Sequence, residues 1–97
     1  MLKFKDGVVW KDMHPRIEAA LPILDEIYQD VKTECVVTSG RDGKHMEGSL
    51  HYEGKALDIR TYNVLEALVK EIKDSLGVGY DVILEKDHIH IEWDPKQ

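Results

Sequence analysis

Hydrophobic residues recur along this chain with two different periods, which separate helical from extended segments. In residues 14–32 they return every three or four positions, as on one face of a helix. Pro15 suits the first turn of that helix, where its missing N–H costs nothing. Pro22 lies inside the pattern, so we expect it to kink or locally open the helix. The expected apolar face comprises Ile17, Ala20, Leu21, Leu24, Ile27 and Tyr28.

A second helix is expected to begin at Asn63, a suitable N-cap with Glu66 three residues later, and to end at Gly77 and Gly79. Its apolar stripe comprises Val64, Leu65, Leu68, Ile72 and Leu76. Residues 1–13 are expected to form a short strand or arm. Its apolar part is Val8, Val9 and Trp10, and Gly7 marks a turn before them.

Strands are indicated by β-branched residues and by alternation. Residues 35–38 predict a short strand, and residues 39–49, rich in glycine and charge, predict a loop. Residues 55–61 predict another strand. Residues 80–85 and 88–93 predict an antiparallel hairpin with a tight turn at Lys86 and Asp87.

Alternation assigns the side chains of two strands to opposite faces. In residues 55–61, Ala56, Asp58 and Arg60 share one face, while Leu57, Ile59 and Thr61 share the other. In residues 88–93, His88, His90 and Glu92 face one way, while Ile89, Ile91 and Trp93 face the other. The pattern predicts a single α+β domain spanning residues 1–97, with a small, mainly antiparallel sheet and helices packed on one face.

Composition narrows the functional classes. A net charge of −6 argues against binding to nucleic acid or to an anionic membrane. The one cysteine, Cys35, cannot form an intramolecular disulfide or a thiolate zinc site, and its apolar surroundings predict a buried small hydrophobe. The start of the sequence lacks the apolar core of a signal peptide, and no apolar run approaches the roughly 20 residues that cross a bilayer. We therefore expect a cytoplasmic protein, and a monomer.

Three side chains suggest a metal site. His51, Asp58 and His90 supply two imidazoles and a carboxylate, a donor set that zinc takes in tetrahedral catalytic sites with an open position for water. A hydrogen-bonded polar face of the sheet would also explain them. Ferrous iron accepts the same donors, but its usual close His-x-Asp pairing is absent, because His51 and Asp58 lie seven residues apart.

The pattern Ser49-x-His51-x-x-Gly54-x-Ala56-x-Asp58, followed by His88-x-His90, resembles the zinc D-alanyl-D-alanine peptidases. That group includes the L-alanyl-D-glutamate endopeptidases of phage lysis and the hedgehog-like domains. The resemblance spans residues 37–93. It implies that His51, Asp58 and His90 bind Zn²⁺, that Asp87 is the catalytic carboxylate, and that His88 stabilises the transition state.

The resemblance also implies a substrate-binding arginine after a Ser-Gly pair. Here Arg41 follows Gly40 directly, whereas relatives have an intervening residue. Ser49 is expected to bind substrate or to orient His51. Glu85 is the alternative to Asp87 as general base.

The expected function is therefore a zinc metallopeptidase, a hydrolase that cuts peptide bonds next to D-amino acids in peptidoglycan or its fragments. Release to the cell wall would follow phage lysis, as for an endolysin. The alternative is a non-catalytic zinc-binding module of the same fold.

Overall fold

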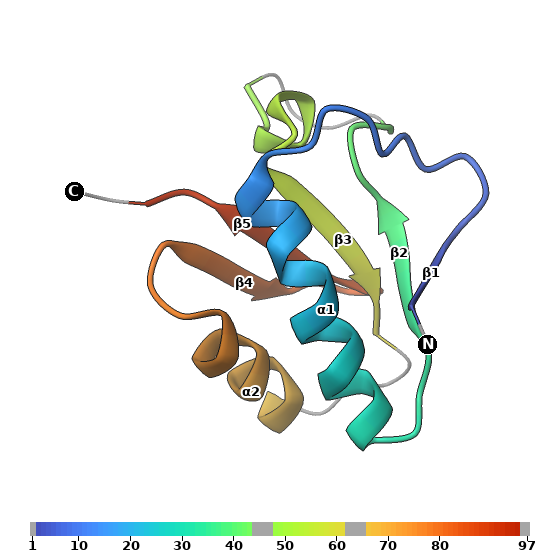
Figure 1. Cartoon of the computed structure of the whole chain (residues 1–97), viewed down its shortest axis with the longest axis vertical. Coiled ribbons are helices and arrows are strands. Elements are labelled where there is room, and N and C mark those ends of the chain that lie inside the picture. The colour runs from blue at the N-terminus through green and yellow to red at the C-terminus, as the bar shows by residue number, and fades with distance from the viewer. Residues whose placement is uncertain (1, 44–47, 62–65, 96–97) are drawn as a thin grey trace.

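A computed structural model describes residues 2–43, 48–61 and 66–95 of the chain, which form one five-stranded sheet with two α-helices (Figure 1). The elements in chain order are β1 (Leu2–Phe4), α1 (Pro15–Asp30), β2 (Cys35–Ser39), the 3₁₀ helix η1 (Leu50–Glu53), β3 (Ala56–Arg60), α2 (Glu66–Leu76), β4 (Tyr80–Leu84) and β5 (His88–Trp93). The predicted α+β class is confirmed.

The strands lie in the order β1-β2-β3-β5-β4. β1 runs parallel to β2, and the other neighbouring pairs are antiparallel, so the sheet is mainly antiparallel as predicted. β5 is inserted between β3 and β4. This order brings two segments that are far apart in sequence into direct register, with Asp58 opposite His90.

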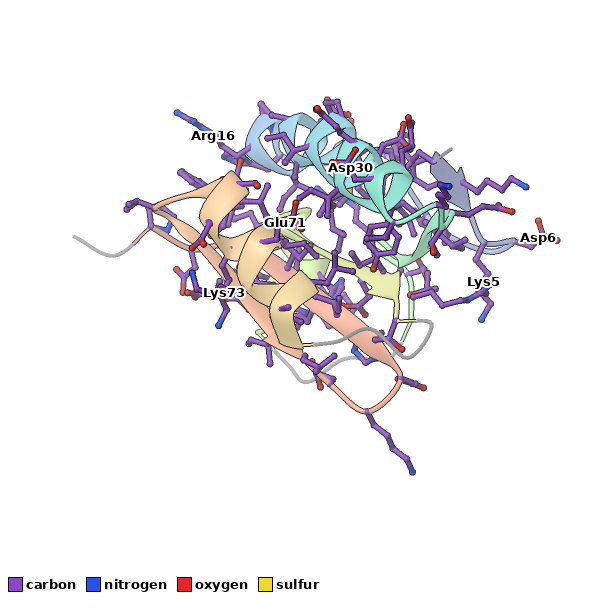
Figure 2. The ribbon with its side chains drawn as sticks, turned by 90° about the horizontal axis from the view of Figure 1, so that it is seen from below. Lys5, Asp6, Arg16, Asp30, Glu71 and Lys73 are labelled. Carbon is purple, nitrogen blue, oxygen red and sulfur yellow. The ribbon has the colours of Figure 1, made fainter. Side chains whose placement is uncertain are left out.

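Both α-helices cover the same face of the sheet, and neither covers the opposite face, which we call the open face (Figure 2). The core lies between helices and sheet. Its fully buried members include Ile17, Leu24, Tyr28, Val37, Leu57, Ile59, Ile72, Ile89 and Ile91. Cys35 is also fully buried in this core, as expected, and burial raises the pKa of its thiol to about 12.

Several element boundaries differ from expectation. The N-terminal strand is Leu2–Phe4, since these residues pair with β2, and not the apolar run Val8 to Trp10. α1 continues through Pro22 without a break, because burial of Ile17 and Leu24 on either side of the proline holds the helix in place despite the missing hydrogen bond. η1 was not foreseen.

The first turn of the second helix cannot be compared with its prediction, because Asn63, Val64 and Leu65 lie outside the described residues. The observed end at Leu76 agrees with the predicted glycine stop. Neither α1 nor the described part of α2 has the length and apolar character needed to cross a bilayer.

Candidate metal centre

Three different elements bring His51, Asp58 and His90 together on the open side of the sheet. His51 belongs to η1, which leads directly into β3, while Asp58 and His90 lie at the middle of β3 and β5. Ser49 is the N-cap of η1, and its hydroxyl accepts a hydrogen bond from the backbone N–H of His51 at 3.2 Å. The rigid sheet sets the direction of two side chains, and the short helix aims the third at them.

The donor atoms of the three side chains form a compact triangle. His51 Nε2 lies 3.2 Å from Asp58 Oδ1 and 3.2 Å from His90 Nδ1, and His90 Nδ1 lies 3.0 Å from Asp58 Oδ1. His51 and Asp58 are only 2% and 6% exposed. The protein therefore shields two of the three side chains of the triangle from bulk water.

The far nitrogen of the His51 ring fixes its tautomer. His51 Nδ1 lies 2.8 Å from the carbonyl oxygen of Gly40. A carbonyl can only accept, so Nδ1 carries the hydrogen and donates it. The lone pair of His51 is consequently on Nε2, the atom that points at Asp58 and His90.

His90 is oriented in the same way by a carboxylate. Its Nε2 lies 2.8 Å from Glu92 Oε1, two residues along the same face of β5. An ionised carboxylate accepts hydrogen bonds, so Nε2 donates, and in the neutral ring the lone pair is on Nδ1. A histidine whose second nitrogen donates to a carboxylate or a carbonyl is the usual arrangement behind a metal ligand.

Three acceptors thus converge with no donor between them when both imidazoles are neutral. This arrangement is unfavourable unless a positive charge, either protons or a cation, lies at the centre. Burial pushes the pKa of Asp58 upwards and that of His90 downwards, but their mutual hydrogen bond and the bonds with His51 and Glu92 prevail. The pKa of Asp58 is therefore held well below its ordinary value, and that of His90 is raised.

The dimensions of the triangle fit a small divalent cation. Zinc bonds of about 2.0–2.1 Å in a tetrahedron place neighbouring ligands about 3.3 Å apart. The three observed edges of 3.0–3.2 Å are close to that value. These three side chains could therefore hold a metal ion. Three protein donors from the described residues leave one tetrahedral position for water or substrate.

A second group of polar side chains lies beside the triangle. His88 shares the open face, and its Nε2 is 3.8 Å from Asp58 Oδ2 and 3.5 Å from Glu85 Oε1. Its Nδ1 donates to Asp87 Oδ1 at 2.6 Å. Burial lowers the pKa of His88, but the hydrogen bond with Asp87 and the charges of Asp58 and Glu85 outweigh it, so the pKa is raised. The same bond lowers the pKa of Asp87.

A pocket of about 400 Å³ opens next to these residues. Asp58, Asp87 and His88 line it together with side chains from β2, β3 and the segment after β1, namely Lys5, Thr38, Ser39 and Arg60. The lining of the pocket therefore combines the metal-site carboxylate of Asp58 and the hydrogen-bonded pair Asp87 and His88 with two cationic residues, Lys5 and Arg60.

The structure places Arg41 in different surroundings. Three of its guanidinium N–H groups donate to the backbone carbonyls of Lys11, Asp12 and Tyr52, at 2.7–2.8 Å. Its role in binding a substrate carboxylate stays a prediction. The Ser49 hydroxyl binds the backbone N–H of His51 as the cap of η1, and its expected roles in binding substrate or orienting His51 stay predictions.

Two members of the site were not singled out from the sequence. The carbonyl of Gly40 gives no sequence signal, because any residue has one. Glu92 carried a signal in its spacing: it is two residues after His90 in a strand, which places both side chains on one face. The presence of Lys5 and Thr38 in the lining of the pocket depends on the order of the strands, which the spacing of residues along the sequence does not specify.

The family of the chain follows from comparison with known proteins. The family model of the Hedgehog amino-terminal signalling domain matches residues 5–92. No curated protein gives a significant match. Since the match covers most of the 97 residues, the chain belongs to this family, whose fold is related to that of zinc peptidases.

Proposed function

We propose that this member of the Hedgehog signalling-domain family is a zinc-dependent peptidase that cleaves peptide bonds next to D-amino acids in peptidoglycan or its fragments. His51, Asp58 and His90 would hold the ion. The observation that carries the proposal is the triangle of ligand atoms from His51, Asp58 and His90, 3.0–3.2 Å apart, beside a pocket that Asp58 lines. A hydrogen-bonded polar sheet face would not need all three acceptors to converge.

The bound ion would supply Lewis acidity, polarising the scissile carbonyl and lowering the pKa of a water molecule. The protein's own groups have complementary tasks. Asp87 lines the pocket, and the hydrogen bond with His88 lowers the pKa of its carboxyl. It would accept a proton from the attacking water and return it to the leaving amine. Glu85, 3.5 Å from His88 Nε2, is the alternative base.

His88 is suited to stabilising developing negative charge. Despite burial, its pKa is raised by the hydrogen bond with Asp87 and by the nearby carboxylates, so the imidazolium form persists to higher pH than in a free histidine, and its Nε2 lies 3.8 Å from Asp58 Oδ2. A preorganised cation near a developing oxyanion lowers the barrier more than it strengthens ground-state binding. Lys5 and Arg60, which also line the pocket, suit a substrate that carries a free carboxylate, as fragments of peptidoglycan peptides do.

The second candidate function is a non-catalytic metal-binding module. It is favoured by the family to which the chain belongs, because that family is a signalling domain. In that case the ion would stabilise the fold or shape a partner surface, and the residues around His88 would contribute nothing to turnover. The exposed pocket beside the triangle is the feature that favours catalysis over this alternative.

The test combines metal analysis with a digest. Purified wild-type protein should carry about one equivalent of zinc and release fragments from peptidoglycan that mass spectrometry identifies. His51→Ala should lose both the metal and the activity. Metal bound without any cleavage would support the non-catalytic module, and unchanged metal content in the variant would remove both candidates.

A further inference from the structure

The segment between β1 and α1 is fastened across the loop that precedes the metal site. We call residues 9–14 the arm. Val9 donates to Asp42 Oδ1 at 2.8 Å, and its carbonyl accepts from the N–H of Arg41 at 2.9 Å. At the other end, the N–H of His14 donates to the carbonyl of Gly54 at 2.9 Å. The arm is thus joined at one end to the Gly40–Asp42 loop and at the other to the residue that closes η1.

Arg41 joins the middle of the arm to η1. Its Nε donates to the carbonyl of Lys11 at 2.8 Å, and Nη2 donates to the carbonyl of Asp12 at 2.7 Å. Nη1 donates to the carbonyl of Tyr52, at 2.7 Å, in η1. Asp12 has a positive φ of 54°, a conformation that non-glycine residues adopt rarely, and the guanidinium holds its carbonyl there. One planar group therefore links the arm to the residue that follows His51.

The arm also packs directly on two glycines. A Cβ added at Gly40 would lie 2.5 Å from the carbonyl oxygen of Val9. A Cβ at Gly54 would lie 2.9 Å from the carbonyl oxygen of Asp12 and 2.9 Å from Arg41 Nη2. No side chain can be accommodated at either glycine while the arm is in place. Gly40 is the residue whose carbonyl holds the ring of His51.

We propose that Arg41 is a positioning residue for the metal centre: it holds the arm against η1 and so fixes the direction of the His51 imidazole. Two contacts connect Arg41 to the ring. Gly40, the residue before Arg41, accepts the hydrogen bond from His51 Nδ1, and Tyr52, whose carbonyl Arg41 binds, is adjacent to His51 in η1. This assignment differs from a substrate-binding arginine. Its metal-related part rests on the proposed function, and its structural part does not.

Cobalt binding without substrate separates the two roles. Arg41→Ala should weaken Co²⁺ affinity at least about tenfold and alter the visible d–d absorption, since groups that orient a ligand typically contribute 10–100-fold. Arg41→Lys should recover only part of this loss, because one ammonium cannot replace a planar fork that spans three carbonyls. Lys11→Ala is the matched control: it removes an arm side chain but keeps the carbonyl that Arg41 binds, and should behave as wild type.

Two measurements on metal-free protein test the structural part. In Arg41→Ala, endoproteinase Lys-C should cleave after Lys11 faster than in wild type, since the carbonyl at that bond is no longer held. The NMR signal of the His51 Nδ1–H proton, protected in wild type by Gly40, should be lost to exchange with water. Both readouts remain informative if the chain takes up no metal.

The inference is overturned if Arg41→Ala and Arg41→Lys bind Co²⁺ with the affinity and spectrum of wild type. A higher KM confined to peptides with a free terminal carboxylate, relative to their amides, would then make Arg41 a substrate-binding residue. If Arg41→Ala does not fold, Arg41→Lys decides the question by the same measurements. A wild-type chain that binds metal but cleaves no peptide leaves the inference standing and rejects only the peptidase.

Discussion

The two faces of β3 and β5 carry different kinds of side chain. One face contributes to the core that stabilises the fold, and the other carries the proposed metal site. Toward the helices, Leu57, Ile59, Ile89 and Ile91 are fully buried. On the open side, Asp58, His88, His90 and Glu92 form the polar cluster. Because a strand repeats every two residues, a one-residue slip of either strand would exchange the two sets. The register of β3 and β5 therefore determines both the buried core and the polar cluster.

The largest effect is expected from a change at the edge of the open face. Asp87→Asn should lower turnover by about 10²–10⁴-fold, the usual contribution of a general base, while zinc content and thermal stability stay as in wild type. The measurement is kcat on a defined peptidoglycan peptide, with metal content determined on the same sample. Glu85→Gln is the matched variant. Full activity in Asp87→Asn together with loss in Glu85→Gln would transfer the role of base to Glu85.

A change on the helix-covered face should act on stability. Ile59→Ala, at a fully buried position next to Asp58, should lower the free energy of unfolding by about 2–5 kcal/mol, since it leaves a cavity in the core. Urea unfolding of the metal-free protein would measure it. Ile59→Val should cost about 0.5–1.5 kcal/mol at the same site. A loss of metal affinity without a loss of stability would show that the two faces are not separate.

A smaller effect tests the residue behind His90. Glu92→Gln keeps the size of the side chain but removes the charge that orients Nε2, so Zn²⁺ affinity should fall about 10–100-fold. A competition titration with a chelator would measure the change. Asp81→Asn, at the neighbouring position on β4, is the control and should leave the affinity unaltered. Equal losses in both variants would point to general electrostatics instead of a contact.

Much of this architecture was predictable because it depends on patterns of residues that are close together in the sequence. The alternation in residues 55–61 and 88–93 correctly separated Asp58 and His90 from Leu57 and Ile89. The two glycines after Leu76 ended α2 as expected. Both features depend on residues a few positions apart, where backbone geometry alone decides the outcome.

The remainder depends on contacts between distant segments. Which strands are neighbours decides that Lys5 and Thr38 line the pocket beside His88, and strand order is settled by packing of the whole chain. The contacts of Arg41 with the arm likewise join residues about 30 positions apart. No local pattern distinguishes an arginine that binds backbone carbonyls from one that faces solvent.

The origin of the three candidate ligands in three separate elements, η1, β3 and β5, has a further consequence. An ion bound there would cross-link positions separated by up to 39 residues, and these contacts do not exist in the unfolded chain. Any ligand that binds only the folded form raises the melting temperature with its free concentration. The thermal stability of the protein and its resistance to proteolysis would then increase with the metal concentration around it. A chelator would make the protein easier to degrade.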